Sequence, residues 1–188
     1  FAPAIPLFMS GEEFDAGYRP LPGLTPDLYG TGEPGSGCWL YGSWLQWEQL
    51  DEKRHRDMFE DVKRMLAIRR EHTDLIHAVE PGSNDIFLNA VPVTPDLEIP
   101  VPYLISDSKR ALLIIANPTD RELEVELELT VELLKLSGYE RGVIVTELWQ
   151  TEGDPCLMTA DDLLRYRCTV SPDHERGGGL HVARFESN

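Results

Sequence analysis

The stretch from Ala4 to Phe14 constrains the fold of this chain more than any other. It is apolar for six residues and then reaches a glycine, Gly11, followed by two acidic residues. A buried parallel strand that ends in a polar loop has this pattern. A parallel strand needs neighbouring strands, and no strand–helix–strand unit precedes this one. The pattern therefore predicts the last strand of a larger parallel sheet, with ligands expected beyond its carboxyl end.

A helix is predicted after residue 50. Apolar residues recur at three- and four-residue spacing from Met58 to Leu66, and charged residues fill the opposite face. Asp51 stands where an N-cap is expected. Such a helix buries one face and leaves the other in solvent. Trp44 and Trp47, just ahead of it, favour packing at the start of the helix over ligand binding.

These segments resemble the C-terminal third of an α-amylase-family enzyme, a member of glycoside hydrolase family thirteen. In that family the eighth strand of the (β/α)8 barrel has the form Gly-x-Pro-x-x-Tyr-x-Gly-x-Glu. The matching residues here are Pro6, Gly11 and Glu13, with Trp44-Leu45-Gln46-Trp47 and Ala67-Ile68-Arg69-Arg70-Glu71-His72 further on. Ala4 replaces the first glycine, and Phe8 or Met9 replaces the tyrosine. The Gly-Glu-Glu-Phe ending is similar to branching, debranching and trehalose-forming members.

The resemblance implies an enzyme that acts on α-glucosidic bonds but whose catalytic residues precede this chain. In the family, an aspartate nucleophile, a glutamate acid/base and a stabilising aspartate lie on the fourth, fifth and seventh strands. No Asn-His-Asp segment, which marks the seventh strand in relatives, occurs in this sequence. Glu12 and Glu13 would face opposite ways on an extended strand, whereas retaining hydrolysis needs two carboxyls about 5–5.5 Å apart. We expect no catalytic residue and no activity from this chain alone.

The predicted substrate-binding residues are Glu13, Trp39 and Tyr41. The two aromatics belong to a glycine- and proline-rich segment, residues 15–41. A loop of such length is usually functional or disordered, and the resemblance places it along the sugar cleft. Its aromatics suit the apolar faces of glucose rings in an α-glucan or oligosaccharide. The alternative is that they pack the loop onto the body of the protein.

The rest of the chain is predicted to be mainly β. Strands are expected at 86–91, 101–105, 112–116, 142–149, 167–170 and 180–185, and prolines at 100 and 102 place the second at an edge. From Leu123 to Val131, apolar residues alternate with glutamates, which indicates a strand with a solvated acidic face rather than a cation site. Thr159 and Asp162 predict a short capped helix. The predicted fold is an antiparallel Greek-key β-sandwich over 79–188, preceded over 1–78 by one strand, a long loop and one helix of a (β/α)8 barrel.

The amino-acid composition limits which classes of partner and which cellular compartment are expected for this chain. The net charge of -16 argues against nucleic acid, and no apolar run reaches the roughly 20 residues that cross a membrane. The three cysteines are widely spaced, which is no disulfide framework and favours a reducing, cytoplasmic compartment. Free buried thiols are expected, with a Cys156–Cys168 bridge as the alternative. The scattered histidines form no metal-ligand spacing, so no metal or cofactor is predicted.

Three functions remain open for the sequence. The first is a C-terminal fragment of an α-glucan-acting glycosidase or transglycosidase, which predicts an exposed apolar patch that could also drive self-association. The second is a stand-alone carbohydrate-binding module, which predicts aromatics aligned on one surface. The third is a scaffold or oligomerisation domain, which predicts a large contact between copies. The opening strand favours the first.

Overall fold

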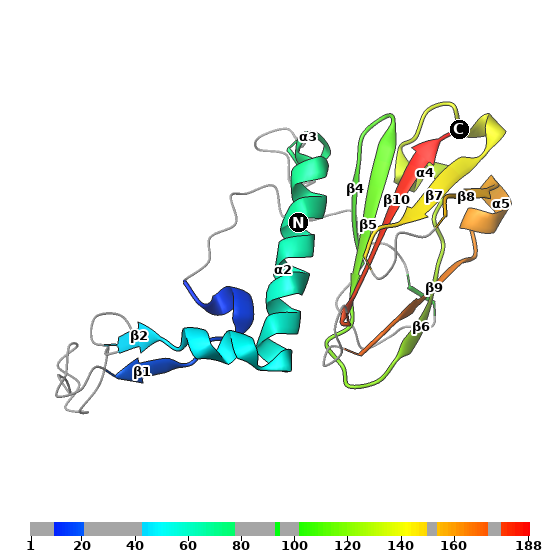
Figure 1. Ribbon diagram of the computed structural model, residues 1–188. Helices are drawn as coiled ribbons and strands as arrows, with labels where there is room; N and C mark the ends of the chain where they lie inside the picture. The colour runs from blue at the N-terminus through cyan, green and yellow to red at the C-terminus, as the bar shows by residue number, and fades with distance from the viewer. Residues whose placement is uncertain (1–9, 21–42, 78–92, 95–101, 150–153, 173–177) are drawn as a thin grey trace, which may run out of the picture. The chain divides into compact units, whose positions relative to one another are not determined.

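The computed structural model describes residues 10–20, 43–77, 93–94, 102–149, 154–172 and 178–188 (Figure 1). Its secondary structure is mainly antiparallel sheet with a few helices, which confirms the mainly β prediction. The chain forms two compact units that divide inside helix α2 (Lys53–Glu71), between Lys63 and Arg64. This division falls earlier than the boundary predicted after 78, because the end of α2 belongs to the core of the later unit.

The earlier unit is centred on Phe14. It contains η1 (Glu12–Phe14), β1 (Tyr18–Pro20) paired antiparallel with β2 (Ser43–Leu45), η2 (Trp47–Asp51) and the first part of α2. Phe14 is fully buried, and its ring centroid lies 5.4 Å from that of Trp47 and 6.4 Å from that of Phe59. The backbone oxygen of Phe14 also lies 2.7 Å from Nδ1 of His55. The turn before β1 is thereby fixed to the start of α2.

The start of α2 differs from the prediction in one residue. Asp51, the expected N-cap, is the last residue of η2. The backbone bond that opens α2 runs from the N–H of Arg56 to the carbonyl of Glu52. Trp47 packs against Phe14 just ahead of the helix, as predicted, while the side chain of Trp44 lies outside the described part.

The later unit is built from two antiparallel sheets. The larger has the strand order β4-β5-β10-β7-β8, with β4 (Tyr103–Ser106), β5 (Arg110–Ala116), β7 (Val143–Glu147), β8 (Cys156–Met158) and β10 (Leu180–Ser187). The smaller has the order β3-β6-β9, with β3 (Val93–Thr94), β6 (Leu123–Leu127) and β9 (Tyr166–Val170). The edge position of β4 confirms what the prolines predicted. The strand expected at 86–91 lies outside the described residues.

Strand β5 is apolar on both sides because both faces of the larger sheet are covered. Leu113 and Ile115 point into a core shared with the smaller sheet, the inner face. Leu112 and Ile114 point to the opposite, outer face. Successive side chains of a strand alternate between faces, so an unbroken apolar run is the pattern of a strand buried twice. Figure 1 shows β5 and β10 side by side, with β6 and β9 in the other layer.

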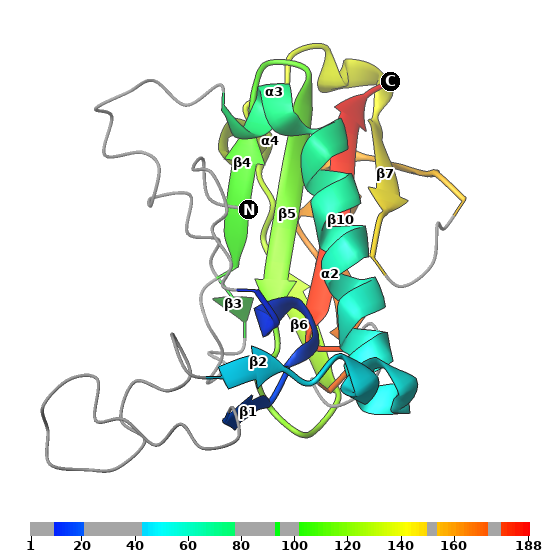
Figure 2. The ribbon, with the colours of Figure 1, turned by 60° about the vertical axis from the view of Figure 1, so that its left-hand side comes forward.

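Two helical segments cover the outer face. Ile68 near the end of α2, and Leu75 and Ile76 of α3 (Thr73–Ile76), form one buried cluster with Leu112 and Val182 of the sheet. Figure 2 views this side, with the last turns of α2 and α3 over β5 and β10. The helix predicted as amphipathic therefore buries its apolar stripe, at this end, against the sheet of its own unit.

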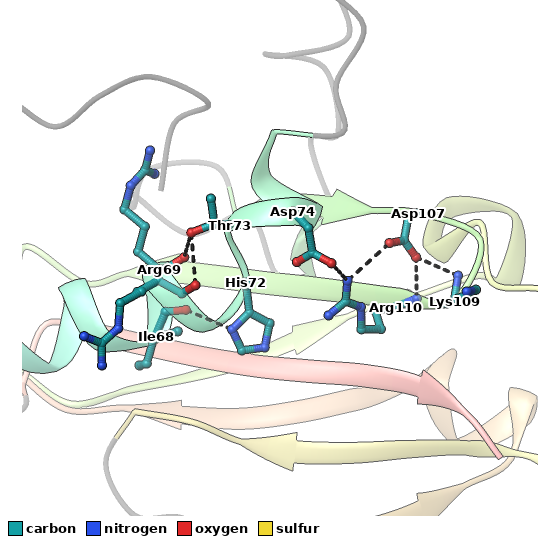
Figure 3. A network of polar contacts seen from close by, with 9 residues as sticks. Ile68, Arg69, His72, Thr73, Asp74, Asp107, Lys109 and Arg110 are labelled. Atoms are coloured by element: carbon teal, nitrogen blue, oxygen red, sulfur yellow. Dashed lines mark hydrogen bonds and ion pairs between the residues drawn. The ribbon is translucent and has the colours of Figure 1, made fainter.

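Polar contacts fasten the edge of this cover (Figure 3). Buried His72 donates from Nδ1 to the backbone oxygen of Ile68, at 2.9 Å. Arg110 of β5 donates to Asp74 of α3 at 2.6 Å. Hydrogen bonding to Arg110 holds the pKa of the Asp74 carboxyl below its ordinary value. Asp107 accepts two backbone N–H groups in the turn between β4 and β5, which positions Arg110 for this contact.

The remaining short helices are α4 (Val131–Leu134), η4 (Tyr139–Arg141) and α5 (Ala160–Leu163). The predicted strand from Leu123 to Val131 is too long, because Thr130 caps α4 and ends the extended backbone. The capped helix at Thr159 is confirmed, with a reciprocal pair of hydrogen bonds to Asp162. None of the helices in the described part is long and apolar enough to cross a membrane.

Candidate functional site

Glu13, the predicted substrate-binding carboxylate, stabilises a turn. It lies in η1 rather than on an extended strand. Its Oε2 accepts a hydrogen bond from the backbone N–H of Gly11 at 2.7 Å. Gly11 has a φ of 104°, and a Cβ there would lie 2.9 Å from carbons of Ala16 and Leu45. Glycine is required at this turn for both reasons, and the Glu13 carboxylate holds it in place. A sugar contact of Glu13 stays a prediction.

The other two predicted sugar contacts, Trp39 and Tyr41, lie outside the described residues, so the structure neither joins them to Glu13 nor separates them. Trp47 is an aromatic of the described part that follows this segment in the sequence. Its side chain is 56% exposed and packs beside Phe14.

The later unit contains a pocket that the sequence patterns did not single out. It has a volume of about 390 Å³ and opens between β8 and β9. Its lining comes from four strands and the residue that leads into one of them: Val145, Glu147, Asp154, Cys156, Met158, Tyr166, Arg167, Cys168, Thr169 and His181. The pocket is therefore where a buried histidine, a carboxylate, a phenol and two thiols meet.

His181 is the centre of this group. It lies on the inner face of β10, in phase with buried Ala183 and Phe185. Its Nδ1 is 2.7 Å from Oε2 of Glu147 on β7. Its Nε2 is 3.0 Å from the hydroxyl oxygen of Tyr166 on β9. The imidazole thereby connects the two sheets.

The surroundings of His181 keep its ring charged. Burial alone would lower the pKa of His181, but hydrogen bonding to Cys168 and to Glu147 outweighs burial and raises the pKa to about 9. At neutral pH both ring nitrogens are then protonated, so Nδ1 donates to Glu147 and Nε2 to Tyr166. Burial raises the pKa of the Tyr166 hydroxyl far above its ordinary value, which keeps the phenol neutral.

Cys168 completes the group with a nucleophile. It lies on the inner face of β9, is half-buried, and lines the same pocket as His181. Within the described part of the chain, no group of His, Cys, Asp and Glu side chains is arranged to hold a metal ion.

The cysteine prediction is confirmed in one respect and wrong in another. Cys156 and Cys168 are both free thiols, as expected. Cys156 is exposed rather than buried, because β8 is an edge strand and its first residue is at the pocket opening. Cys38 lies outside the described residues.

Comparison with protein-family models and with curated proteins finds no match for this sequence. The site must therefore be interpreted from its own chemistry. The two-residue period of the strands could have located part of this site. Cys168 is on the same face as buried Tyr166 and Val170, and His181 is on the same face as buried Ala183. Phase assigns them an inner face, but only the pairing of β10 with β7 brings Glu147 to His181.

Proposed function

We propose that this chain is the C-terminal part of a cytoplasmic α-glucan-acting glycosidase or transglycosidase. In that role it completes the catalytic barrel and supplies an accessory antiparallel Greek-key β-sandwich. The observation that carries the proposal is the packing of Ile68. This residue belongs to the helix that resembles the eighth barrel helix, and it is buried in the outer face of the larger sheet.

The outer face supports this role because it depends on the helix. Without Ile68, Leu75 and Ile76, the side chains of Leu112 and Ile114 would lose their cover. A stand-alone sugar-binding module does not need a preceding helix to cover one face of its sheet. An accessory domain that directly follows a barrel helix would pack that helix against its sheet. The position of β10 between β5 and β7 further supports the Greek-key assignment.

Apolar side chains remain for the proposed barrel to cover. Met58 and Leu66 are two residues of α2 that are each 39% exposed, in a helix that otherwise exposes mainly charged groups. Trp47, just before α2, is exposed further. Exposed apolar side chains were the expected sign of a barrel helix without its neighbouring strands. Self-association through these side chains is the alternative.

Glu13 supports the proposal as a positioning group. In the proposed enzyme the tight turn at Gly11 follows the eighth strand, at the end where barrel enzymes bind substrate. Glu13 fixes this turn, and the proposed sugar contacts of Trp39 and Tyr41 belong to residues outside the described part of the chain. The chain supplies a cleft wall and no catalytic carboxylate.

Two assays on matched samples test the proposal. The purified chain, verified as a single species near 21.3 kDa, is incubated with maltooligosaccharides, glycogen and trehalose. We expect no turnover. Antibodies against the β domain then recover the natural polypeptide that carries this sequence, and we expect that sample to rearrange or hydrolyse α-glucosidic bonds.

Three results would count against the proposal. Turnover by the pure chain would mean that a catalytic carboxylate pair exists within it. A natural polypeptide that is inactive on every α-glucoside would remove the proposed substrate class. Tight glucan binding by the chain alone, abolished by Trp39→Ala, would favour the stand-alone binding module.

A further inference from the structure

We propose that the free edge of strand β8 is a surface for self-association. A second copy of this chain adds its own β8 there, antiparallel, about a two-fold axis at Leu157. The larger sheets of the two copies then continue as one sheet across the dimer. This surface differs from the exposed apolar side chains of α2, and it does not depend on α-glucan chemistry.

Strand β8 ends the larger sheet. Among the described strands, β7 alone pairs with it, with Ile144 opposite Leu157. Figure 1 shows β8 at the end of this sheet, with α5 next to it. The backbone N–H and C=O groups on the unpaired side of an edge strand can bond to a further strand. The edge of β8 can therefore extend the sheet.

Exposed leucines stand along this edge. Leu157, in the middle of β8, is 58% exposed, and Leu164, just after α5, is 42% exposed. Both line a groove of about 800 Å³ whose lining also includes Cys156 and Met158, the other two residues of β8. Edge strands are commonly kept apart by charged side chains, and β8 itself has none. An apolar edge of this kind favours a partner that covers it.

The charge of the groove favours a second copy as that partner. The chain has 33 acidic and 17 basic residues, so an average part of its surface repels another copy. The groove instead has two charges of each sign, from Asp161, Asp162, Arg165 and Arg167. A patch with both signs and no net charge is complementary to itself, as a two-fold interface requires. Asp161 and Arg165 make no ion pair within the described part of the chain, which leaves both for pairing across the dimer.

The two-fold axis fixes one register. Symmetric pairing of a three-residue strand places its middle residue, Leu157, opposite its own copy, and Cys156 opposite Met158 of the second copy. The two Leu157 side chains then lie on one face of the joined sheet and cover each other. Pro155 stands just before β8 and has no backbone N–H, which limits the pairing to these residues. So short a contact predicts a dimer that dissociates on dilution.

Sedimentation velocity over a series of protein concentrations tests for the dimer. We expect the mass to rise from 21.3 kDa towards twice that value as the concentration increases. Leu157→Lys places two like charges opposite each other and removes both leucines from the contact, so the dissociation constant should rise at least about tenfold. Leu66→Lys is the matched control, at a leucine of α2 that is 39% exposed, and it should leave the dissociation constant unchanged.

A cysteine cross-link tests the register. Leu157→Cys is made in a protein in which the three natural cysteines are replaced, by Cys38→Ser, Cys156→Ser and Cys168→Ser. Opposite residues of an antiparallel pair lie about 4.5–5.5 Å apart at Cα, within the range that a disulfide spans. Diamide should therefore convert most of this protein to a covalent dimer. Leu66→Cys in the same background is the control and should stay monomeric.

Three results would overturn the proposal. A single 21.3 kDa species at every concentration would leave the edge of β8 for a strand of another protein. A dimer that Leu66→Lys weakens and Leu157→Lys does not would assign self-association to α2. Equal yields of covalent dimer from Leu157→Cys and Leu66→Cys would mean that the cross-link reports random collisions. If Leu157→Lys fails to fold, the cross-link decides alone, because a cysteine at this position adds no charge to the sheet edge.

Discussion

The two faces of the larger sheet are buried by different chemistry. The cluster that covers the outer face is apolar, while polar side chains such as Thr146 and Arg184 lie beside it and Asp74 and Arg110 stand at the solvent-accessible edge. The inner face is apolar along most of its length but ends in the group of Glu147, His181 and Tyr166. Burying an ion pair contributes little net stability, because desolvation offsets the attraction. The outer face is therefore stabilised mainly by apolar burial, whereas the end of the inner face also buries a charged, hydrogen-bonded group.

Two buried histidines show the same contrast. His72 is buried and donates a hydrogen bond to a backbone carbonyl, that of Ile68. His181 is also buried but meets the carboxylate of Glu147. Burial by itself does not distinguish the two; the partner does. A neutral acceptor makes a histidine structural, whereas a carboxylate keeps it charged inside the protein.

The largest expected losses of stability come from one substitution on each face of the larger sheet. Leu112 and Leu113 are neighbours on β5, both fully buried, one on each face. We expect Leu112→Ala and Leu113→Ala each to lower the free energy of unfolding by about 2–5 kcal/mol. Urea unfolding, with hydrogen exchange of the β5 and β10 amides, measures both. A loss below about 1 kcal/mol for Leu112→Ala alone would mean that the helical cover is weakly attached, and would remove the main support for the proposed function.

The second effect is a pH dependence above neutrality that comes from the inner face. The pKa of His181 is about 9 in the folded chain and about 6.5 when unfolded. The folded chain therefore binds more protons between these values, so this stabilisation is complete below pH 6.5 and is lost as the pH rises through about 9. We expect a loss of about 3 kcal/mol over that range. His181→Gln is the control, because it keeps every other titrating group; an unchanged pH slope in this variant would contradict the prediction.

Local sequence predicted some elements well because their determinants are neighbours in the chain. The capping pair of Thr159 and Asp162 is one case, and the unbroken apolar run of β5 is another. The end of β6 was missed because the alternation of apolar residues and glutamates runs on past Leu127, although Thr130 already caps α4 and Leu129 bonds to the carbonyl of Leu163. The site was missed because its residues are far apart in the sequence. Glu147 and His181 meet only once β10 has paired with β7.

A smaller effect concerns the hydroxyl that joins the two sheets. Tyr166→Phe keeps the ring and its edge-to-face contact with Phe185 but removes the acceptor of the His181 N–H. We expect the free energy of unfolding to fall by about 1.5–3 kcal/mol, the net value of a hydrogen bond to a charged group. Thermal unfolding measures the change. Tyr139→Phe, at an exposed tyrosine, should have almost no effect; equal losses in both variants would mean that the Tyr166 hydroxyl contributes nothing specific.

The smallest effect belongs to the edge of the outer face. Asp74 is exposed, so its ion pair with Arg110 is screened by water and salt. Its lowered pKa means that the pair stabilises the folded chain above the ordinary pKa of an aspartate and stops doing so as the pH falls through the folded value. Asp74→Asn should therefore lower the midpoint of urea unfolding only slightly, less than Tyr166→Phe does, and the difference should shrink in high salt. A loss as large as that of Leu112→Ala would show that charge, rather than apolar burial, holds the helical cover on the sheet.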